Sequence, residues 1–118
     1  MNAKGKEAIV GFIDEKLSDA YEELKEGRFE DRAFFNALLN AIDEMKKNPE
    51  VGIPVPSALW PKIYIQKYGI NNLRKYDLQH GWRLVYTIKS SEINIIAVLL
   101  EWFDSHKKYE KRFGYKKK

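Results

Sequence analysis

The residues of this chain that could do chemistry are Arg, Lys, His and Tyr side chains gathered in the last third of the sequence. They are Arg74, Lys75, Tyr76, Arg83, His106, Lys107, Tyr109 and Arg112. This set suits cleavage of RNA by its own 2′-hydroxyl, which needs a base, an acid for the leaving 5′-oxygen, and cations for the charge on phosphorus. Positioned acids and bases accelerate reactions about 10²–10⁴-fold, and fixed electrostatic donors commonly contribute more. Arginine suits the cationic role because its planar group can hold two phosphate oxygens.

Each candidate also has a purely structural explanation. Arg83 either binds phosphate or points outward and pairs with an acid. Tyr109 is either a reactive group or a half-buried aromatic residue that anchors the last helix. His106 either takes part in catalysis or only neighbours a helix cap. Trp82 and Trp102 are expected in the core rather than as base-stacking platforms.

The remaining residue types support none of several common chemistries. The histidines, His80 and His106, are 26 residues apart, and neither lies in an HExxH pattern or beside paired carboxylates. The sequence has no glycine-rich phosphate loop and no G-x-S-x-G elbow. No metal site and no cofactor is therefore expected, and an oxidoreductase, a P-loop enzyme and a serine hydrolase are unsupported.

Positive charge is concentrated at the C-terminus. Residues 105–118 hold seven bases against one acid, whereas the other 104 residues hold fourteen bases against sixteen acids. A cationic end on a nearly neutral body is typical of a surface that binds a polyanion. For Lys116–Lys118 the alternative is a solvated tail. The expected RNA contacts are Arg74, Lys75, Lys108, Lys111 and Arg112.

The composition predicts one domain over residues 1–118. Hydrophobic residues make up 44% of the chain, enough for a core, and cysteine is absent, which excludes disulfides and suits a reducing cytoplasm. The longest apolar stretch, Ile93 to Phe103, is shorter than the about 20 residues of a membrane span. The apolar run 8–13 is too short for a signal peptide. A soluble, cytoplasmic protein without membrane contact is expected.

The first half of the chain predicts one strand and two helices. Residues 8–13 are β-branched and aromatic, which favours a strand, and Asp14 can cap the helix that follows. That helix ends near Gly27, and Glu30 or Asp31 begins the second, which stops at Asn48. The apolar stripe of the first helix is Leu17, Ala20, Tyr21 and Leu24. That of the second is Phe34, Ala37, Leu38, Ala41, Ile42 and Met45. Two such helices predict a hairpin that covers a sheet.

Residues 49–72 are the least regular segment. Three prolines and Gly52 favour an extended path, and Ser57 followed by Pro61 predicts a short helix through Tyr68 that Gly69 closes. We expect this segment to form a lid over one edge of the sheet.

The last third predicts three strands and a helix. Residues 73–78 and 82–88 are strands joined by a tight turn at 79–81, and 93–102 follow a turn at 89–92. The third strand is apolar on both faces, which favours a central place. Ser105 can cap a final helix, Lys107 to Phe113, before Gly114. The predicted fold class is α+β, in the order β-α-α-β-β-β-α, with an antiparallel sheet covered by the helical hairpin.

Three segments of the last third resemble the RelE/ParE superfamily of toxins. Residues 81–86, Gly-Trp-Arg-Leu-Val-Tyr, are similar to the G-[YW]-R-[LI]-[VI]-Y hairpin of that family. His106-Lys107-Lys108-Tyr109 resembles the H-[RK]-x-x-Y signature after the family's last strand, and residues 72–78 match the preceding strand in position. The predicted element order also resembles the family fold.

The resemblance implies a type II toxin: a metal-independent, ribosome-dependent mRNA endoribonuclease that an antitoxin protein neutralises. It implies catalytic roles for Arg83, His106, Lys107 and Tyr109, and Lys75 matches a family lysine. Its expected partners are the antitoxin, the ribosome and mRNA, with no small-molecule cofactor.

Three acids depart from the family pattern and keep an alternative open. Asp77 stands near the place of a second family lysine, and Glu101 and Asp104 bring negative charge to the end of the last strand. Carboxylates there repel phosphate unless they pair with a base. The alternative is a non-catalytic RNA- or protein-binding member of the same fold. Nothing favours the gyrase-poisoning branch of the superfamily.

Overall fold

Five strands form one mixed sheet in the computed structural model, which describes residues 7–91 and 93–114. Their order across the sheet is β1 (Ile9–Phe12), β5 (Ile95–Phe103), β4 (Arg83–Ser90), β3 (Arg74–Asp77) and β2 (Ile53–Pro54). The α+β class is confirmed, and β5 takes the expected central place. The expectation of a purely antiparallel sheet is wrong, because β1 runs parallel to β5. Strand direction depends on the distant partner, which the local residue pattern does not encode.

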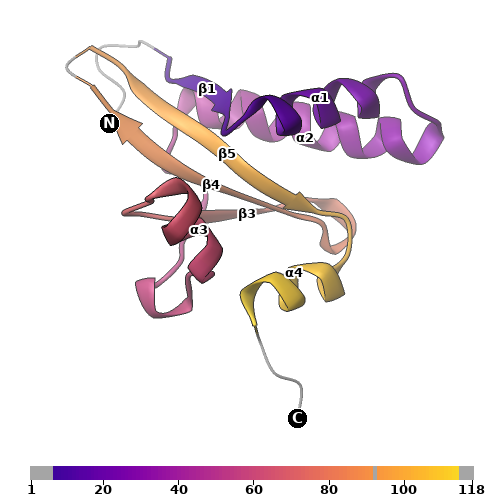
Figure 1. Cartoon of the computed structure of the whole chain (residues 1–118). Helices are drawn as coiled ribbons and strands as arrows, with labels where there is room; N and C mark the ends of the chain where they lie inside the picture. Colours follow the sequence, from indigo (N-terminus) through magenta and orange to yellow (C-terminus); the bar gives the residue numbers. More distant parts are fainter. Residues whose placement is uncertain (1–6, 92, 115–118) are drawn as a thin grey trace.

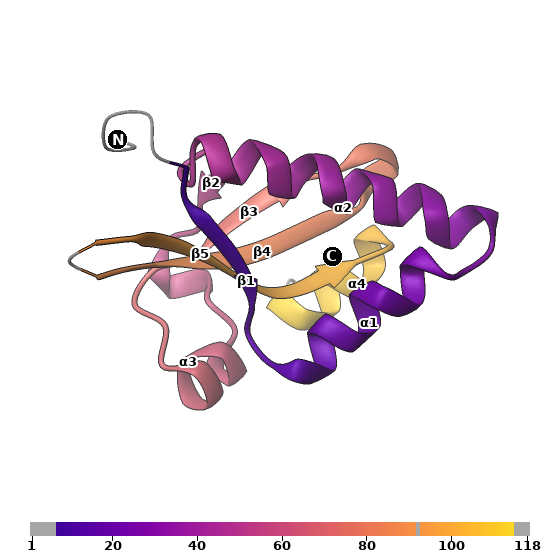
Figure 2. The same ribbon diagram turned by 90° about the horizontal axis from the view of Figure 1, so that it is seen from above.

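A helical hairpin covers one face of this sheet, as predicted (Figures 1 and 2). It consists of α1 (Glu15–Lys25) and α2 (Phe29–Lys47). Asp14 caps α1, since its side chain accepts a 2.9 Å hydrogen bond from the backbone of Leu17. All six apolar residues predicted for the second helix are buried, and five of them belong to the core between the hairpin and the sheet. The stripe of α1 lies at the rim, where all four of its members are only half-buried.

The segment 49–72 does more than cover an edge. Residues 53–54 form the edge strand β2 themselves, paired with β3. The predicted single helix is broken at Pro61 into η2 (Ser57–Leu59) and α3 (Lys62–Tyr68), and Gly69 closes α3 with φ +60°. The lid prediction is thus corrected, because the segment extends the sheet and then covers its second face.

The start of this segment is fastened by Tyr86 of β4. Its buried hydroxyl donates to the carbonyl of Pro49 at 2.6 Å and accepts from the backbone N–H of Gly52 at 2.9 Å. A Cβ at position 52 would come within 2.8 Å of the Tyr86 ring, so only glycine allows this close approach.

The elements of the last third lie close to their predicted places. The turn η3 (Gln79–Gly81) joins β3 to β4, with positive φ at His80 and Gly81. β4 extends to Ser90, two residues beyond the prediction. The last helix, α4 (His106–Phe113), is capped by Ser105 and ends at Gly114 with φ +73°.

The two faces of the sheet carry separate cores. Leu84 and Tyr86 point toward the hairpin, whereas Val85 points to the face covered by α3 and α4. A bulge in β5 adds one residue here: Tyr86 pairs with Leu99 and Val85 with Glu101, leaving Leu100 unpaired. Leu100 and Glu101 therefore both face α3 and α4. No helix of the described residues is long and apolar enough to cross a membrane.

Candidate functional site

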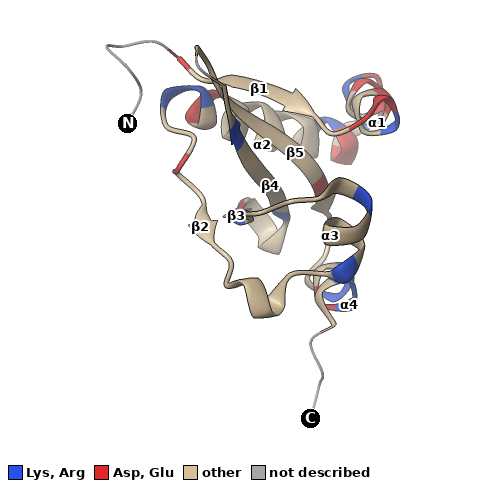
Figure 3. Cartoon of the chain, turned by 60° about the vertical axis from the view of Figure 1, so that its left-hand side comes forward, with Lys and Arg blue, Asp and Glu red and all other residues tan. Residues whose placement is uncertain are grey.

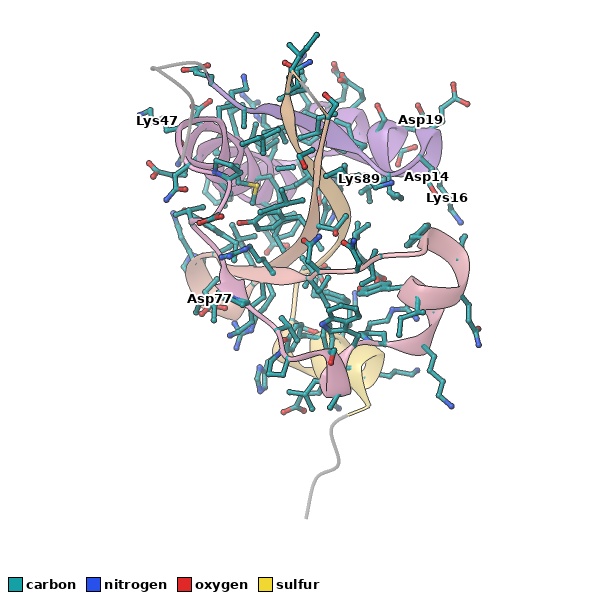
Figure 4. All side chains as sticks on the ribbon, turned by 90° about the vertical axis from the view of Figure 1, so that its left-hand side faces the viewer. Asp14, Lys16, Asp19, Lys47, Asp77 and Lys89 are labelled. Atoms are coloured by element: carbon teal, nitrogen blue, oxygen red, sulfur yellow. The ribbon has the colours of Figure 1, made fainter. Side chains whose placement is uncertain are left out.

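Strand pairing gathers three charged residues on the face covered by α3 and α4. Asp77 is the cross-strand partner of Arg83, and Lys75 pairs with Val85 on the same face. Because side chains alternate along a strand, Lys75, Asp77 and Arg83 share this face. Arg83 also pairs with Phe103, the last residue of β5, so the first turn of α4 follows beside it. Figure 4 shows Asp77 well away from the layer formed by α1 and α2.

Arg83 is at the centre of this cluster, and three of its contacts involve other side chains. One Nη lies 3.4 Å from Nδ1 of His106, and Nε lies 3.4 Å from Oδ1 of Asp77. The guanidinium carbon lies 5.2 Å from the centre of the Tyr109 ring, a cation–π contact. The Asp77 contact is an ion pair without hydrogen-bond geometry, so the buried Nε–H makes no hydrogen bond within the described residues. A buried donor left in this way favours an incoming acceptor.

His106 links Arg83 to a carboxylate. Its Nε2 lies 2.8 Å from Oε2 of Glu110, one turn further along α4. Arginine has no acceptor atom, so Nδ1 must be the acceptor in the contact with Arg83. That leaves Nε2 as the donor to Glu110. This tautomer presents a lone pair, on Nδ1, toward the guanidinium group.

Tyr109 supplies the floor of the cluster. It is 3% exposed and stacks on Phe113 with ring centres 4.5 Å apart. Phe103 meets it edge-on at 5.5 Å. The ring thus fixes where the Arg83 guanidinium rests, and burial keeps Tyr109 from direct contact with a large ligand.

One carboxylate, that of Asp77, contacts both cations of the cluster. Nζ of Lys75 lies 3.4 Å from the same Asp77 oxygen that approaches Arg83. Asp77 is about half exposed, so this pairing is solvent-screened and worth little in stability. A phosphate group, which offers more acceptor oxygens, could displace Asp77 from both cations.

Several predicted RNA contacts lie elsewhere or are already paired. Arg74 points to the other face, where its Nη1 donates to the carbonyls of Glu50 and Gly52 at 2.9 and 2.6 Å. Lys108 pairs with Asp104 at 2.9 Å. Lys107 and Lys111 are exposed on α4. Lys116–Lys118 lie outside the described residues.

Arg112 is held in a network that the sequence did not reveal. Its Nε and Nη2 donate to the two Glu101 oxygens at 2.9 and 3.0 Å, and Tyr64 donates to Glu101 at 2.6 Å. Burial, followed by the charge of Glu101, raises the pKa of Tyr64. The hydrogen bond with Glu101 raises the pKa of Arg112. The network joins α3, β5 and α4, so it sets the position of the helix that carries His106 and Tyr109.

The structure therefore brings together Lys75, Arg83, His106 and Tyr109 from the predicted set. Sequence reasoning missed Glu110 as the partner of His106, although their four-residue spacing on a helix was a usable signal. No local signal links Glu101 to Arg112, which are eleven residues apart in different elements.

Comparison of the chain with models of protein families, with curated proteins and with solved structures finds no match.

Proposed function

We propose that this protein is an endoribonuclease of the RelE type that cleaves mRNA without a metal ion. The observation that carries the proposal is the juxtaposition of Arg83 and His106, 3.4 Å apart above the Tyr109 ring. A cation that can bind phosphate beside an imidazole that can act as a base supplies two of the groups that 2′-hydroxyl attack requires, and the third is an acid for the leaving oxygen.

The reaction begins when a phosphate of the RNA displaces Asp77 and binds the Arg83 guanidinium group. As the Arg83 guanidinium group turns to the phosphate, it releases Nδ1 of His106. Nδ1 then takes the proton from the 2′-hydroxyl while Glu110 holds the imidazole through Nε2. The 2′-oxygen attacks phosphorus, and the bond from phosphorus to the 5′-oxygen breaks. Lys107, exposed on the first turn of α4, gives a proton to the leaving oxygen. The products are a 2′,3′-cyclic phosphate and a 5′-hydroxyl, and solvent returns the proton from His106 to Lys107.

The proposal includes the partners that the resemblance implies. A ribosome would hold the mRNA against a site whose cations, Lys75 and Arg83, are already paired with Asp77. An antitoxin protein would neutralise the enzyme in the cytoplasm. Lys75 would contact a second phosphate, since it lies on the same face as Arg83.

The same Asp77 contacts favour a second candidate function. A carboxylate within 3.4 Å of both Lys75 and Arg83 weakens the attraction of this face for phosphate. This second function is that of a non-catalytic protein of the same fold, which would bind RNA or a protein without cleaving it.

Controlled expression in bacteria, with mapping of mRNA 5′ ends, tests the proposal. The enzyme should stop growth and leave new 5′ ends at defined codon positions in translated mRNA, and Arg83→Ala should abolish both. Lys62→Ala, which removes an exposed charge on α3, is the matched control and should act like the original chain. Normal growth with intact mRNA, despite soluble protein, would reject the nuclease and leave the binding function.

A further inference from the structure

The aromatic ring of Phe29 lies almost fully in solvent at the start of α2. Its exposure is 85%, and it is the one aromatic residue among the strongly exposed large hydrophobic side chains of the described part. A single exposed apolar residue is ordinary on a protein surface. The residues around Phe29 indicate what kind of ligand could contact this ring.

Two arginines flank the ring on the same side of the helix. A hollow of about 460 Å³ is lined by Arg28, Phe29, Arg32, Ala33 and Asn36 together with Gly27. A helix turns 100° per residue, which places this set opposite the buried stripe that begins at Phe34. Neither arginine makes an ion pair or a side-chain hydrogen bond within residues 7–91 and 93–114. We call these five residues the Phe29 surface.

The acids of the same helix turn do not neutralise these arginines. Glu30 and Asp31 line a different hollow, beside Trp82 and Trp102. The Asp31 side chain lies so close to Gly27 that a Cβ there would clash with it. Positive and negative side chains thus occupy different sides of the helix start, and Figure 3 shows both colours on the helical layer.

The position of the Phe29 surface leaves it accessible to a large partner. It lies where α1 joins α2, and Figures 1 and 2 both show this end of the hairpin projecting beyond the sheet. The hairpin covers one face of the sheet, whereas Arg83 and His106 lie on the other. A ligand on the Phe29 surface is therefore separate from one at Arg83.

We propose that the Phe29 surface binds a single-stranded RNA segment, with one base stacked on Phe29 and phosphates on Arg28 and Arg32. An aromatic ring between free cations is the arrangement by which proteins hold single strands without reading their sequence. Arg28, the N-cap of α2, and Arg32 line the same hollow as Phe29, which allows both to reach phosphates of one bound strand. This contact does not require that the Arg83 cluster cleaves RNA.

A protein partner fits this surface less well. A standard protein interface covers roughly 800 Å² on each side and has a hydrophobic centre. The next strongly exposed apolar residue on α2 is Leu39, ten residues and therefore about 15 Å along the helix. One ring between two cations suits one base better than a hydrophobic interface.

Fluorescence anisotropy with a labelled 2′-O-methyl oligouridine of about 12 nucleotides tests this contact. The blocked 2′-oxygen prevents cleavage, so the measurement is independent of catalysis. Phe29→Ala should weaken binding roughly 5- to 150-fold, and Phe29→Trp should restore it. Arg28→Ala and Arg32→Ala should each lower the slope of log affinity against log salt by about 0.7. Ile93→Ala, at a residue 75% exposed in the β4–β5 turn, is the matched control and should bind like the original chain.

The outcomes separate this contact from the proposed nuclease. Equal binding by the original chain and Phe29→Ala would overturn the proposal. Binding that is lost in Arg83→Ala but unchanged in Phe29→Ala, Arg28→Ala and Arg32→Ala would also overturn it. A chain that fails to bind the oligonucleotide would also overturn it and leave the surface to a protein partner. Intact mRNA in the expression experiment, together with weaker oligonucleotide binding by Phe29→Ala, would reject the nuclease and keep the RNA contact.

Discussion

Asp77 and Arg83 face each other across β3 and β4, with the carboxylate oxygen 3.4 Å from the Arg83 Nε. The same oxygen lies 3.4 Å from the ammonium group of Lys75. One carboxylate thus occupies the position that a phosphate would take between these two cations. On the proposed function, displacing Asp77 from these two cations would be a condition for binding RNA at this face.

Replacing Asp77 by Asn should strengthen RNA binding. An exposed ion pair is worth at most about 1 kcal/mol, so its removal should tighten binding of an uncleavable oligonucleotide up to about 5-fold. Asp43→Asn, an equal charge change on an exposed residue of α2, is the control for anisotropy titrations. Equal tightening by both variants would indicate a general charge effect rather than release of Arg83.

Tyr109 should act through its ring rather than through its hydroxyl. Tyr109→Phe keeps the aromatic floor under Arg83, so cleavage rates should fall by less than the about 10²-fold that loss of an acid or base costs. Tyr109→Leu removes the cation–π contact and should lower the rate further. Single-turnover cleavage on ribosomes measures both variants, and a loss of 10²-fold or more in Tyr109→Phe would instead assign chemistry to the hydroxyl.

Glu101 should matter more to stability than Arg112, because it accepts hydrogen bonds from both Arg112 and Tyr64. Glu101→Ala should lower the free energy of unfolding by about 2–3 kcal/mol, since it leaves Tyr64 without its charged acceptor. Arg112→Ala should cost about 1 kcal/mol, because that pair is partly screened by solvent. Urea unfolding measures both, with Glu23→Ala, on an exposed residue of α1, as control. Equal losses in the two variants would contradict this ranking.

The raised pKa of Tyr64 predicts a loss of stability in base. Burial and Glu101 raise the pKa of the folded state above the ordinary tyrosine value near 10. The unfolded chain then releases a proton first, so the contribution is complete below pH about 10 and declines as pH rises above it. Tyr64→Phe should flatten this decline in urea titrations between roughly pH 9 and 11. An unchanged slope would show that other groups, such as the buried Tyr86, cause the decline.

Tyr86→Phe should destabilise the chain without altering the Arg83 cluster. It leaves a carbonyl of Pro49 and the N–H of Gly52 without their buried partner, which should cost about 1–3 kcal/mol. Thermal unfolding monitored by circular dichroism measures this loss. Unchanged stability would mean that water replaces the hydroxyl.

Local patterns were sufficient to predict most elements but not their pairing. The helix caps at Asp14 and Ser105 and the buried stripe of α2 follow from residues a few positions apart, so they could be read directly. The parallel pairing of β1 with β5 and the edge strand β2 depend on contacts between distant segments.

The same limit applies to the candidate site. The sequence assigned Lys75 and Arg83 to neighbouring strands and His106 to the start of the last helix, but only the pairing register of β3 and β4 places Lys75 and Arg83 on one face. The same alternation sends Arg74 to the opposite face, away from its predicted role. Arg112 could not be assigned from sequence, because its partner Glu101 comes from another element and its orientation depends on the bulge in β5.

Because of the bulge, β5 should tolerate the loss of one residue at position 100 better than between Ile95 and Leu99. Removing Leu100 would restore strict alternation and leave Glu101, Trp102 and Phe103 on their present faces. Losing one residue between Ile95 and Leu99 would instead reverse the facing of every residue on one side of the gap. Deletion at position 100 should therefore cost only the packing of the buried Leu100 side chain, whereas deletion a few positions earlier should also expose part of the core. Only at the bulge can β5 lose a residue and keep the same side chains inside and outside.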